Sequence, residues 1–208
     1  MKIENFQLNA RNLTSNYFYG FLVGASEDGT VYQRKKKNEY MVEIEQKSKY
    51  WLEFVQEIIL RFYKKSVKIR KTSKGFYRIR IYSKKFFNQI KKHRINSSWI
   101  LRKSKEFQLG FLQGVYDAEG SIKKSRNHIT ISSNRKDLIR ILQILLRNLN
   151  FRLGKTWKDY NGVITLPFYG KDNLKRFQEL INFRHPKKKE RLAELLNDNY
   201  LQTPKMVS

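Results

Sequence analysis

The chain has 208 residues, enough for one domain or for two fused small ones with a substantial core. Its 40% hydrophobic and 14% aromatic content excludes a disordered chain, and the lack of cysteine together with only three histidines excludes disulfides and thiolate metal sites and argues against a zinc site. The 44 Lys and Arg outnumber the 18 Asp and Glu and give a net charge of +26, which predicts a polyanionic partner, nucleic acid before an anionic membrane.

The predicted elements follow an internal repeat. The first unit is an apolar helix, a strand pair, an amphipathic helix, a second strand pair and a final helix, at 17–24, 30–47, 49–65, 66–83 and 84–95. The second unit repeats this order at 107–118, 121–134, 136–150, 152–170 and 171–183. The same number of residues separates Ile44 from Ile131 and Lys84 from Lys171. We therefore predict an α+β fold of two pseudo-symmetric α-β-β-α-β-β-α repeats with antiparallel sheets.

The repeat also predicts where the chain divides. Residues 1–96 are expected to form the first repeat and residues 106–183 the second, with 97–105 as the linker. The stretch 184–208 has no counterpart in the first repeat. It predicts a basic C-terminal helix followed by a tail.

Apolar and basic residues alternate along the predicted strands, so one sheet face should be apolar and the other basic and aromatic. Ile79 and Ile81, for example, alternate with Arg78 and Arg80. Because the charge is almost all of one sign, this face predicts contact with phosphates and base edges rather than an ordinary solvated surface. The predicted nucleic-acid-binding residues are Arg34, Lys36, Lys68, Arg70, Arg78, Arg80, Tyr82, Lys123, Lys124, Arg126, His128, Arg152, Lys155 and Trp157.

The first helix of the second unit ends in the motif Gly114-Val-Tyr-Asp-Ala-Glu119-Gly120. The motif and the repeat together resemble the LAGLIDADG homing endonucleases, from Tyr17 to about Phe183, and look closest to single-chain, archaeal, intron-encoded members. The resemblance implies that two motif helices pack side by side at a pseudo-twofold interface. It also implies that the acid at each helix end holds divalent metal over the minor groove of a long DNA site, with the two sheets forming a saddle on the DNA.

Two helices approach closely only where their contacting residues are small and one turn apart. In the second unit we expect Gly114 and Ala118 to make this contact, with the acid Glu119 directly after them and Gly120 ending the helix. Carboxylates at such a helix end are ligands for a hard cation such as Mg²⁺, which activates water and neutralises a leaving oxygen.

In the first unit, Gly20 and Gly24 satisfy the same packing rule. This register assigns the position of the acid to Ala25. The alternative register, with Asp28 as the acid, would place a bulky residue and a charge at the tightest contact. Packing therefore favours Ala25, so one acid is expected to be missing.

An alanine at this position predicts a chain that binds its DNA site but cuts poorly or nicks only one strand. Either the acid was removed, by drift or by deliberate inactivation, or Glu27 or Asp28 reaches the metal from the turn. The main interpretation treats Glu27 and Asp28 as exposed turn residues.

The resemblance also implies roles for residues at the ends of the strand pairs. A polar residue after the first pair would order water near the metal: Gln46 in the first unit and Ser133 in the second. A basic residue after the second pair would lie near the scissile phosphate: Lys84 or Lys85, and Lys171. The expected ion is Mg²⁺ or Mn²⁺, with Ca²⁺ occupying the site without cleavage.

The sequence thus predicts a monomeric, site-specific endonuclease for double-stranded DNA, with intron RNA as a second candidate partner. The alternatives are a non-cleaving binder on the same scaffold, such as an intron RNA maturase or a DNA-binding regulator, and a ribosome-associated RNA binder. No apolar run approaches the roughly 18–20 residues of a membrane span, and the first residues lack a signal-peptide core. We therefore expect a protein that is not secreted, in a prokaryotic cytoplasm or an organelle.

Overall fold

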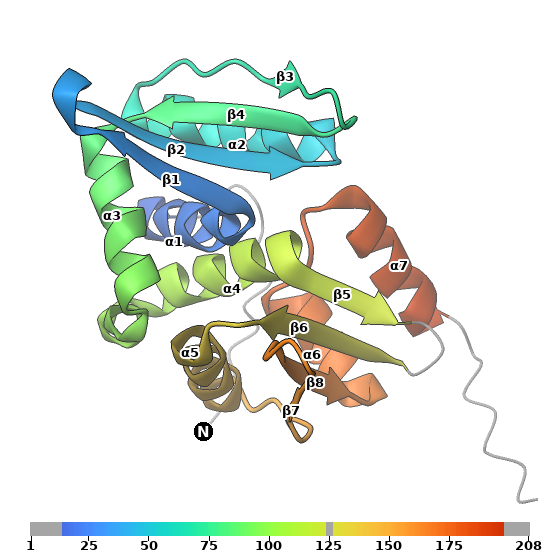
Figure 1. The fold of residues 1–208 in the computed structure, drawn as a ribbon. Coiled ribbons are helices and arrows are strands. Elements are labelled where there is room, and N and C mark those ends of the chain that lie inside the picture. Colours follow the sequence, from blue (N-terminus) through green and yellow to red (C-terminus); the bar gives the residue numbers. More distant parts are fainter. Residues whose placement is uncertain (1–13, 124–126, 198–208) are drawn as a thin grey trace, which may run out of the picture.

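The structure, a computed structural model, describes residues 14–123 and 127–197 (Figure 1). Its first half contains α1 (Ser15–Ala25), β1 (Gly29–Arg34), β2 (Glu39–Gln46), α2 (Lys49–Tyr63), β3 (Arg70–Lys71), β4 (Tyr77–Tyr82) and α3 (Lys84–Ile95). Its second half contains α4 (Lys105–Glu119), β5 (Gly120–Lys123), β6 (His128–Ser133), α5 (Lys136–Asn148), β7 (Trp157–Lys158), β8 (Ile164–Tyr169) and α6 (Lys171–Leu180), followed by α7 (Pro186–Asn197). Three short 3-10 helices are η2 (Ser26–Asp28), η3 (Lys35–Lys37) and η4 (Ser98–Arg102). The predicted α-β-β-α-β-β-α order is confirmed in both halves.

Each half is built on one four-stranded antiparallel sheet, ordered β1-β2-β4-β3 in the first half and β5-β6-β8-β7 in the second. The registers are equivalent, because Gly29 lies opposite Ile44 and Gly120 lies opposite Ile131. Figure 1 shows the two sheets on opposite sides of the central pair α1 and α4. The predicted outer strands are shorter than expected, since β3 and β7 each contain only two residues.

Side-chain caps fix the starts of both motif helices. Thr14 accepts a hydrogen bond from the backbone N–H of Tyr17 at the start of α1, and Ser104 accepts one from Phe107 at the start of α4. Ser48 and Ser83 cap α2 and α3 in the same way. The caps of α1 and α4 stand at equivalent positions of the repeat, so the two helices begin in the same register.

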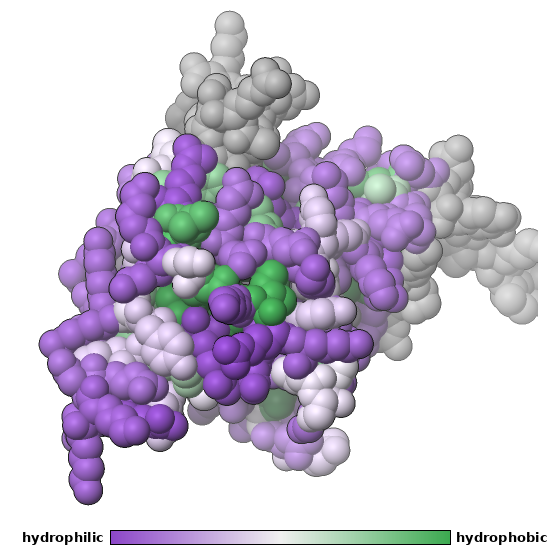
Figure 2. Space-filling view, turned by 90° about the horizontal axis from the view of Figure 1, so that it is seen from above, coloured by the Kyte–Doolittle hydropathy of each residue, from purple (hydrophilic) through white to green (hydrophobic). Residues whose placement is uncertain are grey.

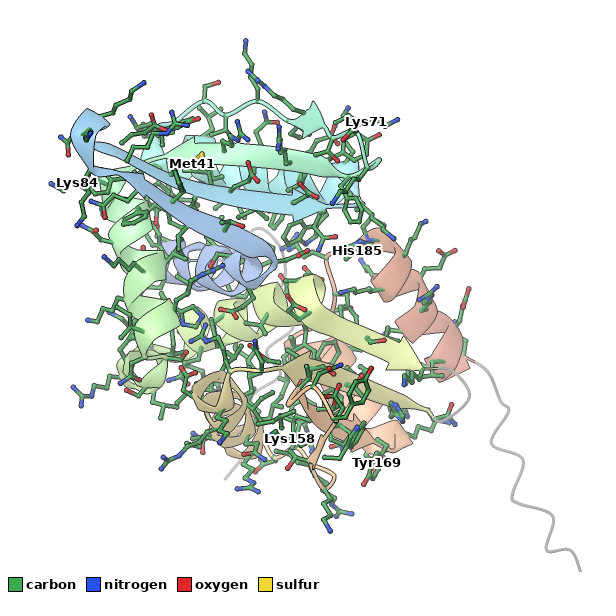
Figure 3. All side chains as sticks on the ribbon, in the orientation of Figure 1. Met41, Lys71, Lys84, Lys158, Tyr169 and His185 are labelled. Atoms are coloured by element: carbon green, nitrogen blue, oxygen red, sulfur yellow. The ribbon has the colours of Figure 1, made fainter. Side chains whose placement is uncertain are left out.

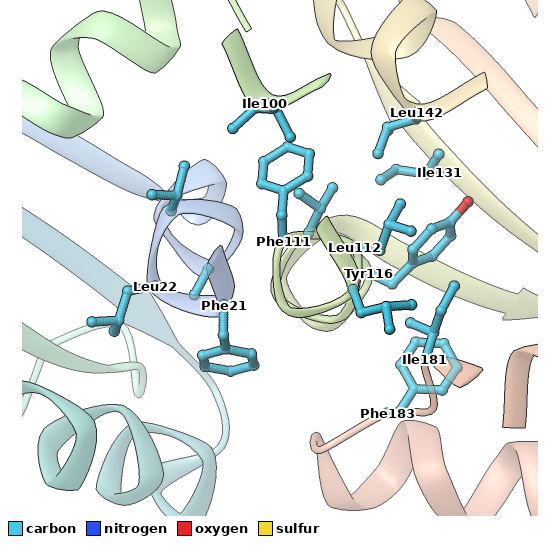
Figure 4. Close-up of a cluster of buried hydrophobic side chains, with 14 of the residues drawn as sticks. Phe21, Leu22, Ile100, Phe111, Leu112, Tyr116, Ile131, Leu142, Ile181 and Phe183 are labelled. Atoms are coloured by element: carbon cyan, nitrogen blue, oxygen red, sulfur yellow. The ribbon is translucent and has the colours of Figure 1, made fainter. Parts of the chain in front are cut away.

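The hydrophobic core is continuous through both halves. Figure 4 shows α1 and α4 side by side, with Phe21 and Leu22 on α1 and Phe111, Leu112 and Tyr116 on α4 reaching into the surrounding core. All five side chains are fully buried. Within residues 14–123 and 127–197, no helix is both long and apolar enough to cross a lipid bilayer.

Four glycines allow the backbones of α1 and α4 to touch. A Cβ on Gly20 would lie 2.0 Å from the carbonyl oxygen of Phe107, and a Cβ on Gly110 would lie 2.0 Å from that of Tyr17. Gly24 and Gly114 repeat this reciprocal arrangement, with 2.3 and 2.2 Å to the carbonyl oxygens of Phe111 and Phe21. No side chain fits at these positions. The contact follows the pseudo-twofold symmetry of the repeat.

This geometry corrects one expectation about the interface. Gly20, Gly24 and Gly114 do make the close contact, but the fourth member is Gly110 and not Ala118, which is half-buried beyond the crossing. Gly24 therefore corresponds to Gly114. The prediction matched the glycine pair of α1 to the wrong turn of α4.

A polar network also joins the two halves. The Glu27 side chain, only 7% exposed, is bound by His93 of α3 and by Arg135 of the second half, whose Nη1 lies 3.0 Å from Glu27 Oε1. Arg135 also donates to Asp137 Oδ2 at 2.9 Å, and Ser97 donates to the same oxygen through its N–H and its hydroxyl. The ion pairs thus tie η2, the linker and the start of α5 together.

We expect Gly110→Ala to lower the free energy of unfolding by about 3 kcal/mol or more, because the added Cβ would overlap a backbone carbonyl that has no room to move. Urea denaturation measures the change. The exposed residue Asn16 on α1 provides the control, since Asn16→Ala should stay within about 0.5 kcal/mol of the parent. Equal stability of the two variants would contradict the close helix contact.

The ion pair of Asp137 predicts a pH-dependent contribution to stability. Burial would raise the pKa of Asp137, but hydrogen bonds from Arg135 and Ser97 outweigh it and lower this pKa. The stabilisation is therefore present above the unfolded-state pKa of about 4 and is lost as pH falls through the lower folded-state value.

Asp137→Asn should accordingly destabilise the protein by about 1 kcal/mol at pH 7, and by progressively less as the pH approaches 3. Denaturant unfolding of parent and variant over this range measures the difference. The exposed Asp172→Asn on α6 is the control and should show no such trend. A difference that is constant with pH would exclude the charged interaction.

Candidate active site

The two motif helices deliver one carboxylate each to the place where they end. Glu119 is the last residue of α4 and Asp28 is the last residue of η2, which continues α1. Each acid directly precedes the first residue of a strand, and those strands begin in equivalent sheet registers. Asp28 therefore occupies the position in the first half that Glu119 occupies in the second.

A change of helix type brings Asp28 to this position. The stretch from Gly24 to Asp28 is one residue shorter than the stretch from Gly114 to Glu119. An α-helix rises about 1.5 Å per residue, whereas a 3-10 helix rises about 2.0 Å, so both stretches advance by about 7.5 Å along the axis. The 3-10 turn thus compensates for the missing residue.

The two carboxylates interact electrostatically. Burial and the nearby negative charge of Glu119 raise the pKa of Asp28 to about 7. Burial, followed by the charge of Glu27, also raises the pKa of Glu119, although this side chain still reaches solvent. The ends of the two helices therefore form a half-buried site with concentrated negative charge, which a bound cation would relieve.

Ala25 does not occupy the position of the acid. Its side chain is fully buried, and its backbone nitrogen lies 2.7 Å from where a Cβ on Gly114 would stand. Ala25 is thus part of the helix crossing, nearly one turn before Asp28. The expectation that Ala25 replaces a lost acid is wrong, because the acid of each half follows the second glycine of the contact by about a turn rather than directly.

Of the two acids considered in the turn, only Asp28 belongs to this site. Glu27 points instead into the polar network with His93 and Arg135. Burial would raise the pKa of Glu27, but the hydrogen bond and charge of His93 and the charge of Arg135 outweigh it and lower that pKa. Glu27 is therefore held as a buried anion between the halves.

The predicted polar residues at the strand ends lie near the acids. Gln46, at the end of β2, donates from Nε2 to Asp28 Oδ2, and its Oε1 accepts a hydrogen bond from the N–H of Lys47. Ser133 lies at the matching end of β6, where its hydroxyl accepts the N–H of Arg135 at 3.1 Å. Gln46 thus orients one carboxylate directly.

The predicted basic residues Lys84, Lys85 and Lys171 do not lie at this site. Gln46 lies opposite Tyr77 at the start of β4, whereas Lys84 follows Tyr82 at the end of β4, opposite Met41. The five residue steps from Tyr77 to Tyr82 span about 17 Å, so Lys84 is at least that far along the sheet from Gln46. Figure 3 shows Lys84 far from His185, whose N–H binds Asp117 near the end of α4. Lys171 likewise follows Tyr169, at the end of β8 away from the start of β5. The expectation overlooked that β4 and β8 run antiparallel to β2 and β6, so each ends at the opposite end of the sheet from Gln46 and Ser133.

The open face of the first sheet carries the predicted basic and aromatic side chains. Its members include Tyr32, Arg34, Met41, Glu43, Glu45, Arg70, Arg78, Arg80 and Tyr82, while Val42, Ile44, Ile79 and Ile81 lie on the buried face. Lys36 in η3 and Lys68 before β3 are exposed beside it. Figure 2, which views the molecule from above Figure 1, shows a mostly hydrophilic surface with small separate apolar patches.

The acidic residues Glu43 and Glu45 of this face were missed in the sequence. Glu43 forms two ion pairs through Oε2, which lies 2.5 Å from Arg80 Nε and 3.8 Å from Arg78 Nη1. The alternation of Glu39, Glu43 and Glu45 with apolar neighbours in β2 was a visible signal. Glu43 holds two arginines at defined positions on this face.

The second sheet matches the prediction less well. Lys123, Arg152, Lys155 and Trp157 are exposed, but His128 is only 6% exposed and is not a surface residue. Lys124, Arg126 and the predicted tail from 198 to 208 lie outside the described residues. The open face here carries Lys123 of β5, with small hydroxyl side chains and Tyr169 where the first sheet has arginines.

The donor set at the helix ends suits a hard divalent cation. Asp28 and Glu119 supply carboxylate oxygens, and no group of three or more His, Asp or Glu residues forms a metal-ligand cluster in the described ranges. An ion with only two protein carboxylates keeps several water molecules or phosphate oxygens as ligands, which is the usual coordination of Mg²⁺. The residues present therefore fit a hard divalent cation that keeps open coordination positions.

Comparison with known proteins agrees with this geometry. The family profile of a LAGLIDADG-like domain matches residues 25–93 and 106–182, one match in each half. The homing endonuclease I-ApeI of Aeropyrum pernix is 31% identical over 199 residues, which cover 86% of this chain and 87% of that protein.

Solved structures give the same result. An I-DmoI variant in complex with its target DNA and in the presence of manganese has a TM-score of 0.66 at 26% identity, covering 80% of this chain and 94% of that one. Another I-DmoI variant, with its target DNA and magnesium, has a TM-score of 0.64 at 25% identity, covering 80% and 96%. With a family match in each half and a full-length relative, this chain belongs to the LAGLIDADG family, as a two-repeat member homologous to the homing endonuclease I-ApeI.

Proposed function

We propose that this chain is a site-specific homing endonuclease that hydrolyses phosphodiester bonds within a long, asymmetric double-stranded DNA target. The observation that supports the proposal most directly is the meeting of Asp28 and Glu119 at the ends of two helices in contact. Both acids come from one chain, so a monomer contains the whole site. The two halves differ in sequence, which suits a target whose two halves also differ.

Asp28 and Glu119 would hold Mg²⁺ or Mn²⁺, which when bound supplies an activated water and neutralises the leaving oxygen. Gln46 keeps the Asp28 carboxylate oriented through its hydrogen bond. Such outer contacts commonly change metal affinity or activity by about 10–100-fold. The electrostatic repulsion between the Asp28 and Glu119 carboxylates supports a divalent ion as the occupant of this site.

The open faces of the sheets would read the DNA. Arg80 and Arg78 stand on the first sheet with Glu43 fixing them, an arrangement that favours bidentate contacts to guanine in the major groove. Exposed residues outside the strands, such as Lys68, would bind phosphates and position the duplex without reading its sequence.

The non-cleaving alternative loses its main support. It depended on Ala25 standing in the place of an acid, and Ala25 is buried in the helix crossing instead. The complete pair Asp28 and Glu119 supports cleavage of both strands.

The proposal predicts the effect of removing either acid. Asp28→Asn and Glu119→Gln should each slow cleavage by at least about 10³-fold, since a metal ion contributes several kcal/mol of charge stabilisation in the transition state. The target duplex is first selected from a randomised DNA library by binding in Ca²⁺ and then cut with Mg²⁺. Single-turnover rates measure the loss, and DNA affinity in Ca²⁺ should change little.

The variant Ala25→Asp tests whether Asp28 or position 25 is the place of the acid in the first half. Because Ala25 is fully buried in the helix crossing, the variant should unfold more easily and gain no activity. Faster cleavage by Ala25→Asp, or unimpaired cleavage by Asp28→Asn, would show that Asp28 is not the acid of the first half.

The sheet residues predict two kinds of affinity loss. Arg80→Ala should weaken DNA binding by about 1–3 kcal/mol and relax specificity at one base pair. Lys68→Ala should weaken binding to all duplexes alike, and should lower the slope of log affinity against log salt concentration by about one. Competition binding with singly mismatched duplexes at several salt concentrations measures both. Identical profiles for the two variants would contradict base reading by Arg80.

A further inference from the structure

A lysine from the C-terminal helix binds the end of α4. Lys188 of α7 donates from Nζ to the carbonyl oxygens of Asp117 at 2.6 Å, Tyr116 at 3.1 Å and Ala118 at 3.4 Å. These carbonyls belong to the last turn of α4, where helical N–H partners run out. The Tyr116 oxygen also accepts the N–H of Gly120. Lys188 therefore acts as a side-chain cap directly before Glu119.

The first half has a counterpart at the same place. Arg94 of α3 donates from Nη2 to the carbonyl oxygens of Ser26, at 3.0 Å, and of Gly29. Both basic residues thus come from a helix outside the α1–α4 pair, and both bind backbone oxygens beside a motif carboxylate. Arg94 lies in α3 and Lys188 in α7, which are not equivalent elements of the repeat. The two residues therefore share a position beside a motif carboxylate but do not correspond in sequence.

The electrostatics of the site explain why a cation is needed here. A helix C-terminus carries a partial negative charge, and a carboxylate at that end adds to it. Two such ends converge at Asp28 and Glu119. A fixed positive charge against the carbonyls offsets this repulsion and keeps the last turn of α4 helical.

The number of donors limits what Lys188 does. An ammonium group has three N–H donors, and three carbonyl oxygens surround Lys188 Nζ. All three N–H groups are thus directed at backbone oxygens, which favours a structural role for Lys188 over phosphate binding. Lys188 also lies beyond the family match, which ends at residue 182.

We propose that Lys188 is a positioning residue for cleavage: its charge and its three hydrogen bonds fix the end of α4 and so hold Glu119 at the metal. This inference rests on the proposed nuclease function. It makes α7 part of the active site, although α7 lies outside the two repeats. Arg94 performs the same task for η2 in the first half.

The test compares Lys188→Met with Lys189→Met. Lys189 is the next residue of α7, is exposed, and loses the same charge without touching α4. On a plasmid that carries the selected duplex, Lys188→Met should slow cleavage at least about tenfold. It should slow the two strands unequally, because the hydrogen bonds of Lys188 are to α4 alone and Gln46 still holds Asp28. Nicked plasmid would accumulate, while DNA affinity in Ca²⁺ stays within about threefold. Lys188→Arg should recover most of the rate.

Two results would overturn the proposal: identical rates for Lys188→Met and Lys189→Met, or an equal slowing of both strands accompanied by lost DNA affinity. A second measurement needs no DNA. The N–H of Gly120 donates to Tyr116, so its hydrogen exchange reports on the last turn of α4. Exchange should be at least about tenfold faster in Lys188→Met only. If the parent protein cuts no duplex, this readout still decides the positioning role, and unchanged exchange would reject it.

Discussion

The backbone contact between α1 and α4 is the constraint on which the rest of the structure depends. Gly20, Gly24, Gly110 and Gly114 allow each helix to place carbonyl oxygens where a side chain would otherwise stand. This fixes the position and rotation of both helices at once. Because a strand begins directly after each helix end, the same contact also sets where the two sheets begin. The acids and the DNA-facing surfaces are therefore positioned by one interaction.

The close contact concentrates negative charge, and the surrounding elements balance it. The carboxylates of Asp28 and Glu119 meet where two helices present their carbonyl ends. Gln46, Arg94 and Lys188 each approach this region from a different element. A similar balance holds on the open sheet face, where the Glu43 carboxylate pairs with both Arg78 and Arg80.

The sequence revealed periodic features and missed those that depend on exact spacing or on the backbone. The repeat and the alternating strands could be predicted, because hydrophobic periodicity and repeat order are visible in the sequence. The place of Gln46 beside the acid was expected from the family resemblance. The first acid was misplaced because the rule matched Gly20 and Gly24 to Gly114 and Ala118 instead of to Gly110 and Gly114. The 3-10 turn η2 then shortens the spacing to the acid by one further residue. Gly110 was visible, since it precedes Gly114 at the spacing of Gly20 and Gly24. Lys188 had no signal, because its partners are backbone carbonyls.

The 3-10 turn has a consequence for how such motifs are recognised and how they evolve. From the second contact glycine to the acid, the two halves share the rise along the helix axis but not the number of residues. A deletion in the last turn is therefore neutral when the backbone can tighten from α to 3-10 geometry. Searches that require a fixed spacing will register such a copy as degenerate although its acid is in place. Apparent decay of one motif in a duplicated chain is thus weak evidence for a lost activity.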